Sequence, residues 1–162
     1  MTNAVDYLNR RFDVLALQGA KSQGEVLLAQ SIFNHANGGQ ICTGVQKLAQ
    51  RWTLEFLTIK GSMPFHMSDR GSDFLRWVRQ GRVRSEFDVR AYFNFAASQV
   101  KTSLVNEETA DMPLEDRFER ATLEQITIFQ DSLGLYVNVV SLAGDTRQVI
   151  LPISITTANL TI

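Results

Sequence analysis

The sequence has very little cysteine, histidine and proline. Its 162 residues include one cysteine, two histidines and three prolines. A single thiol, Cys42, excludes an intrachain disulfide and a cysteine cluster for zinc, and it suits a reducing compartment such as the cytoplasm. His35 and His66 do not supply the closely spaced ligands that a metal site needs. We therefore expect neither a metal nor another cofactor.

An excess of charge of one sign is also missing. Lysine and arginine number 16, aspartate and glutamate 17, and the net charge is −1. This balance gives no overall attraction to nucleic acid or to an anionic membrane, and it does little to keep copies of the chain apart, which favours an assembly. No run approaches the ~20 apolar residues that span a bilayer. Residues 1–11 lack the apolar core of a signal peptide.

Apolar residues recur at helical spacing in three segments. The first predicts a helix from Thr43 to about Ile59, and Thr43 and Gln46 have the spacing of a capping box. The apolar face of this helix consists of Val45, Leu48, Ala49, Trp52 and Phe56. A short helix is predicted within residues 71–81, with Ser72 as its cap, and a long helix over residues 86–106. We interpret the aromatic stripes of the two main helices as core.

The last third of the chain has the composition and alternation of strands. Strands are predicted over residues 122–129, 135–142 and 147–155, with turns at 131–134 and 144–145. Pro152 lies in the third strand. Because proline cannot donate to a ladder, this strand is predicted to lie at a sheet edge or to contain a bulge.

These elements predict an α+β fold, with three helices packed on a C-terminal three-stranded antiparallel meander. The domain is expected over residues 39–156. Residues 1–38 are interpreted as an N-terminal arm with a short strand near residues 12–17, and residues 157–162 as a tail. A meander covered by helices leaves an open strand edge, which is either a liability or a binding site.

A set of positions spread over residues 44–74 carries a family resemblance. These positions are Gln50, Leu57-Thr58, Gly61, Pro64-Phe65 and Gly71. In this pattern the chain resembles the family of phage baseplate wedge proteins related to sheath initiators, which are also labelled lysozyme-like. A long helix, an acidic linker and a terminal meander follow in the family's order, so the resemblance covers about residues 39–155. Two places differ: Ser62-Met63 replaces a glutamate-containing pair, and Glu119-Arg120 lacks the proline of a Glu-Pro-Arg signature.

The resemblance implies a non-enzymatic structural protein of the virion, in the baseplate of a contractile tail that assembles in the host cytoplasm. Such proteins nucleate the contractile sheath. The implied partners are the sheath protein, the tail tube and baseplate wedge proteins, with several copies of this chain around the tail. The implied mechanism is pairing of main chains at a sheet edge. The candidate contacts on the third strand are Val149, Leu151, Ile153 and Ile155.

A cluster of arginines marks a second candidate interface. It consists of Arg76, Arg79, Arg82 and Arg84, with Trp77 and Phe87 interleaved. Arginine and tryptophan are enriched at interface hot spots, so we predict a protein interface here, with Glu119 and Arg120 as a further contact. A plain salt-bridged surface is one alternative and a nucleic-acid surface is another. Nearby acids would neutralise much of the positive charge, so we do not expect nucleic acid as a partner.

Other functions remain open beside the sheath initiator. A head–tail connector or tail-completion protein is one, a small nucleic-acid-binding module is another, and a peptidoglycan hydrolase is a third. A hydrolase needs paired carboxylates. The acids between Glu107 and Glu119 lie on a linker that contains Pro113 and indicates a solvated loop. Cys42 lies near a helix start, which can lower a thiol pKa, but we interpret it as a small buried side chain.

Overall fold

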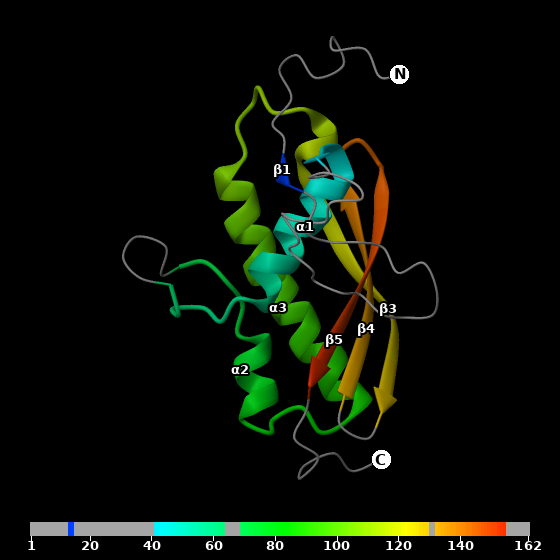
Figure 1. Cartoon of the computed structure of the whole chain (residues 1–162). Coiled ribbons are helices and arrows are strands. Elements are labelled where there is room, and N and C mark those ends of the chain that lie inside the picture. The colour runs from blue at the N-terminus through cyan, green and yellow to red at the C-terminus, as the bar shows by residue number, and fades with distance from the viewer. Residues whose placement is uncertain (1–12, 15–40, 64–68, 130–131, 155–162) are drawn as a thin grey trace, which may run out of the picture.

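The computed structural model of the protein describes residues 13–14, 41–63, 69–129 and 132–154. In chain order the elements are β1 (Asp13–Val14), β2 (Ile41–Cys42), α1 (Gly44–Leu57), α2 (Phe74–Arg79), α3 (Glu86–Glu107), the 3-10 turn η3 (Leu114–Asp116), β3 (Phe118–Phe129), β4 (Ser132–Ser141) and β5 (Thr146–Ser154). The predicted α+β class and the C-terminal meander are confirmed (Figure 1). Within the interpreted arm the structure describes β1, which pairs with β2. The tail lies outside the described residues.

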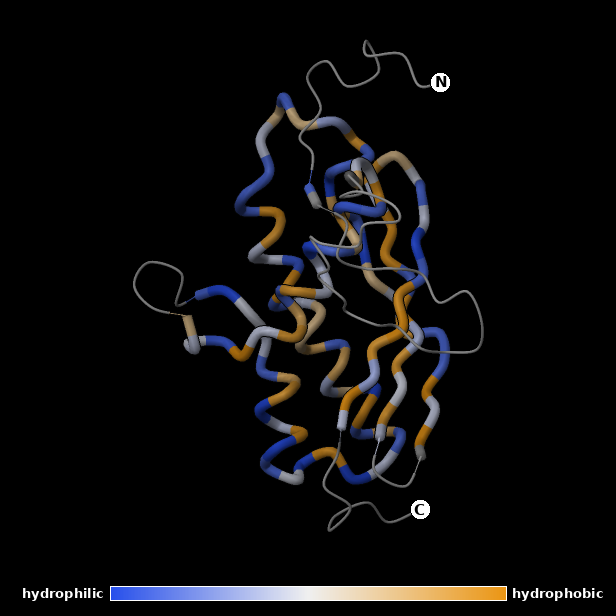
Figure 2. Tube along the Cα trace, viewed as in Figure 1, coloured by the Kyte–Doolittle hydropathy of each residue, from blue (hydrophilic) through white to orange (hydrophobic). Residues whose placement is uncertain are grey.

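The sheet has the order β3-β4-β5, and both pairings are antiparallel. Along β4 the side chains alternate between buried and half-buried, as Figure 2 shows by hydropathy. Val137, for example, is fully buried and lies opposite Leu123 on β3 and Val149 on β5. The strand period of two thus gives the sheet one apolar face. Helix α1 packs against β4 and β5 and α3 packs against β3, so that this face is covered.

The core between the helices and the sheet is rich in aromatic rings. Trp52 and Phe56 stack along α1 with their ring centroids 4.8 Å apart. Phe56 also meets Phe74 of α2 at 5.1 Å and Phe93 of α3 at 5.4 Å. All four side chains are fully buried. The periodic stripe predicted for α1 is therefore the one that joins the three helices.

The helix caps differ from the predicted ones. Thr43 is the N-cap residue of α1 but makes no capping side-chain hydrogen bond, so the predicted capping box is wrong. Helix α2 begins after Asp73 rather than after Ser72, but the buried Ser72 hydroxyl accepts from the Phe74 N–H at the start of α2 and donates to the Phe56 carbonyl of α1. The complete capping box belongs to α3. There the Ser85 hydroxyl accepts from the Asp88 N–H, and the Asp88 carboxylate accepts from the Ser85 N–H.

The first hairpin of the sheet is longer than predicted. β3 begins at Phe118 rather than at residue 122, and β4 begins at Ser132, so Gly134 lies in a strand and not in the turn. Gly134 pairs with Thr127, and a Cβ atom built on Gly134 would lie 2.4 Å from the Thr127 Oγ1. Glycine is therefore present inside the strand because a neighbouring side chain occupies the space.

Candidate interaction surfaces

Strand β5 is an outer strand of the sheet. It pairs with β4 and with no other strand of the described residues, so one of its edges is open there. Pro152 lies in this strand, as the prediction of an edge requires. Along this edge, β5 has a row of main-chain donors and acceptors that no other described strand pairs with.

The candidate contact side chains on β5 need correction. Val149, Leu151 and Ile153 are only 5%, 1% and 5% exposed, and they pack in the core. They point inward because they alternate with the outward-facing residues of the strand. Their side chains therefore hold β5 on the domain and are not exposed to a partner. Ile155, the fourth candidate, lies outside the described residues.

The hairpin geometry indicates which main-chain groups of β5 face the open edge. The Ser141 N–H donates to the Asp145 carbonyl. From this pair onward, residues that exchange main-chain hydrogen bonds between β4 and β5 recur at every second position. Arg147, opposite Val139, is then bonded to β4. Gln148 and Ile150 point their N–H and C=O groups to the other side, in the same direction as Pro152. Pro152 therefore costs the ladder no hydrogen bond, and it interrupts the donors of the open edge.

The four arginines of the predicted cluster fall into two pairs. Arg76 and Arg84 make local contacts: Arg76 binds the Asp73 carboxylate and the Lys60 carbonyl, and Arg84 donates to the Gly81 carbonyl. Arg79 and Arg82 are exposed and make no ion pair within the part of the chain that the structure describes. Two of the four guanidinium groups thus remain available to a partner. The surface is therefore neither fully salt-bridged nor strongly basic.

Aromatic side chains lie beside these arginines. The Trp77 ring of α2 lies 4.9 Å from Tyr92 and 5.5 Å from Phe95, both on α3. Phe95 is 59% exposed and Phe87 is 80% exposed. Neither residue belongs to the aromatic stripes that the sequence predicts as core, and Phe93, which does, is fully buried. The signal that identifies Phe95 is its offset from the stripe of Val89, Phe93 and Val100, which places it on the opposite side of the helix.

The structure does not join the arginine cluster to the β5 edge in one surface. Helix α2 packs mainly against α3 and α1, whereas α1 and α3 form the layer that covers the sheet. Figure 1 shows α2 beside this helical layer. Glu119 and Arg120 lie at the start of β3, the opposite outer strand, where their side chains pair with each other. The predicted contacts are thus divided among three places.

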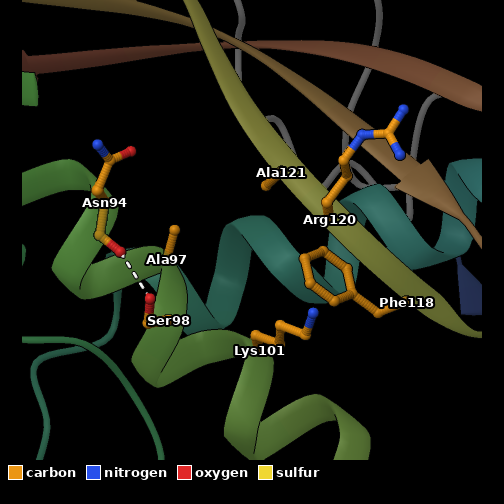
Figure 3. Close-up of a pocket in the computed structure, with 7 residues that line it drawn as sticks. All are labelled: Asn94, Ala97, Ser98, Lys101, Phe118, Arg120 and Ala121. Atoms are coloured by element: carbon orange, nitrogen blue, oxygen red, sulfur yellow. Dashed lines mark hydrogen bonds between the residues drawn. The ribbon is translucent and has the colours of Figure 1, made fainter.

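A pocket of about 210 Å³ lies between α3 and β3. It is lined by Asn94, Ala97, Ser98 and Lys101 of α3 and by Phe118, Arg120 and Ala121 of β3 (Figure 3). Figure 3 shows the Lys101 ammonium group beside the Phe118 ring, and the Arg120 guanidinium group directed away from it on the other side of the strand. Sequence reasoning missed the pocket because its two walls are separated by the loop between α3 and β3.

The acidic segment from the end of α3 to β3 is solvated only in part: residues 109–111 are exposed, but several of its carboxylates are bound. Glu107 binds both Arg51 and Arg70, and Glu108 accepts from the Phe118 N–H. Asp116 forms an ion pair with Lys47 in which both side chains are almost fully buried. The carboxylates that a hydrolase interpretation would use are thus bound to cations that hold α1, α3 and β3 together. Among the described residues, no group of three or more acids, histidines or cysteines is placed to hold a metal ion.

The Cys42 thiol is buried, as interpreted from the sequence. It is 3% exposed and donates to the Asp13 carbonyl at 3.5 Å. Burial raises the pKa of the Cys42 thiol, and the negative charge of Asp13 raises it further. Proximity to the start of α1 does not outweigh these two effects. The thiol is therefore a poor nucleophile in the folded protein.

This raised pKa makes stability depend on pH in the alkaline range. The folded protein binds the thiol proton more tightly than the unfolded chain, whose cysteine has a pKa of about 8.5. The stabilisation is complete below that pH and is lost as the pH rises through the folded-state pKa. Urea unfolding at pH 7 and pH 10 should show a loss of stability that is smaller in Cys42→Ala. An equal loss in both proteins would contradict this expectation.

Comparison with protein-family models, with curated proteins and with solved structures found no match. None of the helices among the described residues is both long and apolar enough to cross a membrane.

Proposed function

We propose that this protein is a structural subunit of a contractile phage-tail baseplate, and that it nucleates the sheath by offering the open edge of β5 to a sheath subunit. The proposal joins the resemblance of residues 39–155 to baseplate wedge proteins with one observation. That observation is the outer position of β5, a nine-residue strand with a single strand neighbour among the described residues. Sheath protein, tail tube and wedge proteins are its partners, and the virion baseplate is its location.

The main-chain groups that make this contact belong to every second residue of β5, because alternate residues of a strand direct these groups to opposite sides. The main-chain groups of Thr146, Gln148 and Ile150 face outward, and a partner strand pairs with them by antiparallel or parallel hydrogen bonds. Pro152 interrupts the row of donors, so uninterrupted pairing is limited to the first half of β5. A short contact of this kind is weak by itself. Several copies around the tail present it at high effective concentration, which makes the ring bind firmly.

The first half of β5 is suited to this role because its outer side chains are polar. Thr146, Arg147 and Gln148 are all exposed. An edge of this composition does not aggregate as an apolar edge does, and pairing is then directed by the partner. The buried Val149 and Leu151 fix the strand on β4 and the helices, so that the edge is presented rigidly.

The test is a proline that removes one outward donor. Gln148→Pro deletes an N–H that faces the open edge, so it leaves the β4–β5 ladder intact and should lower the unfolding temperature only slightly. The same substitution should abolish nucleation of sheaths from purified sheath subunits of the same phage, measured by light scattering and electron microscopy. Gln148→Ala keeps the N–H and should nucleate normally.

The controls separate a folding defect from an assembly defect. Val149→Pro removes a donor to β4 together with a core side chain, and it should unfold the sheet. If Gln148→Pro nucleates sheaths as well as the parent protein, the β5 edge is not the contact and the proposed mechanism is wrong. If neither protein nucleates sheaths but both join tail tubes to heads, the protein is a connector.

A further inference from the structure

The other outer strand of the sheet, β3, also has an open edge. This twelve-residue strand pairs with β4 and with no other strand in the described parts of the chain. Bulges interrupt the pairing between Phe118 and Arg120 and between Leu123 and Gln125. Between these bulges a regular stretch, Arg120–Leu123, pairs with Val140–Val137. This short stretch borders the pocket between β3 and α3.

The pocket has the size of a side-chain site. Small residues, Ala97 and Ser98 on α3 and Ala121 on β3, leave the space open, and the buried Phe118 forms part of its wall. Its volume of about 210 Å³ is below the roughly 300–1,000 Å³ that free small-molecule ligands occupy. It therefore suits one or two side chains that arrive on another polypeptide.

One positive charge sets the chemistry of the occupant. Lys101 is exposed and makes no ion pair with any residue that the structure describes. Arg120 also lines the pocket, but its guanidinium group pairs with Glu119 and is directed away from Lys101 (Figure 3). No carboxylate lines the pocket. An acidic side chain entering it meets one ammonium group and an apolar wall, without a competing negative charge.

We infer that the edge of β3 binds an extended segment of another protein, and that an aspartate or glutamate of this segment enters the pocket and pairs with Lys101. The main chain of the segment adds to Arg120–Leu123 as a further strand, which gives affinity, and the acidic side chain gives selectivity. Successive side chains of such a strand alternate in direction, so every second residue of the segment faces the pocket. This contact is independent of the proposed sheath contact on β5.

The experiment selects binders from random ten-residue peptides displayed on their own mRNA, with the full chain as bait. Enriched peptides should carry an acidic residue between β-branched residues. Their affinity, measured by fluorescence anisotropy, should fall about tenfold or more in Lys101→Glu, as loss of a charge-assisted hydrogen bond predicts. Ser98→Phe, at an exposed position, should fill the pocket and weaken binding similarly. Arg90→Glu makes the same charge change at an exposed position of α3 outside the pocket and should leave binding unchanged.

The outcomes separate this inference from the function proposed above. Gln148→Pro, which alters the β5 edge, should bind the selected peptides normally. Peptides that lack acidic residues, or that bind Lys101→Glu as tightly as the parent, overturn the inference. Peptides lost in Gln148→Pro but not in Lys101→Glu bind β5, and they overturn the inference while leaving the sheath contact intact.

Discussion

Replacing Lys47 with methionine is expected to lower the free energy of unfolding by about 3–5 kcal/mol. The Lys47 ammonium group lies 3.1 Å from the Asp116 Oδ2, and the two side chains are 8% and 4% exposed. The other oxygen of Asp116, Oδ1, is buried and accepts no hydrogen bond from the residues that the structure describes. Methionine fits the space but leaves this carboxylate in the interior without the cation, which is why the cost exceeds that of most single substitutions.

A double-mutant cycle measures the pair itself. Asp116→Leu removes the stranded carboxylate, so Lys47→Met with Asp116→Leu should recover most of the lost stability in urea unfolding followed by circular dichroism. Arg90→Met is the matched control, because Arg90 pairs with Glu86 on the surface of α3. Its cost should be about 0.5 kcal/mol. If Lys47→Met costs no more than Arg90→Met, the Lys47–Asp116 pair does not hold the fold together.

The consequence of this ion pair extends to the sheet. Asp116 belongs to η3, which leads directly into β3, and Lys47 belongs to α1, which packs on β4 and β5. The Lys47–Asp116 ion pair thus joins the start of β3 to α1, the helix that packs on β4 and β5. The two outer strands of the described sheet, β5 and β3, are thus joined in one domain by contacts of this kind.

The sequence predicts the elements well because their signals are local. The stripe of α1 and the alternation along β5 each reflect one buried face, and Pro152 identifies an outer strand by its missing donor. Burial follows the same periods, so the core positions of α1, α3 and β5 are predictable. The function suggested by the family resemblance stays a proposal, since it does not follow from these periods.

The contacts that build the candidate surfaces are not predictable in this way. Lys47 and Asp116 are 69 residues apart, and nothing near either residue indicates the other. The acids from Glu107 onward have the pattern of a solvated loop, yet Arg51 and Arg70 bind Glu107 from distant segments. The β5 residues proposed as contacts are apolar, and apolar residues on an alternating strand serve the core before they serve a partner.

Replacing Gly71 with alanine is expected to cost about 3–5 kcal/mol. Gly71 has a φ of +99°, and a Cβ atom there would lie 2.5 Å from the Thr58 carbonyl oxygen and 3.0 Å from the Lys60 nitrogen. Both are main-chain atoms. The Thr58 carbonyl also accepts from the Ser72 N–H at 2.8 Å, so moving it away breaks the bridge that closes the loop between α1 and α2.

Gly61, at the other end of this loop, is the matched control. Its φ is +81°, but a Cβ atom there meets nothing within 4 Å. Gly61→Ala should therefore cost only the conformational strain of about 1–2 kcal/mol. The difference between the unfolding free energies of the two variants, measured with urea, gives the cost of the close approach of the main chains. Equal costs would mean that strain alone makes glycine necessary.

The close approach at Gly71 matters because it places α2. The Gly71 N–H donates to the Glu55 carboxylate at 2.9 Å, and the same carboxylate accepts from the Ser103 hydroxyl of α3 at 2.6 Å. Glu55 thus joins the loop to α1 and α3 at one buried point. If that point is disrupted in Gly71→Ala, the Trp77 ring should lose its contact with Tyr92 and Phe95. Tryptophan fluorescence of the folded variant should then shift, whereas that of Gly61→Ala should not.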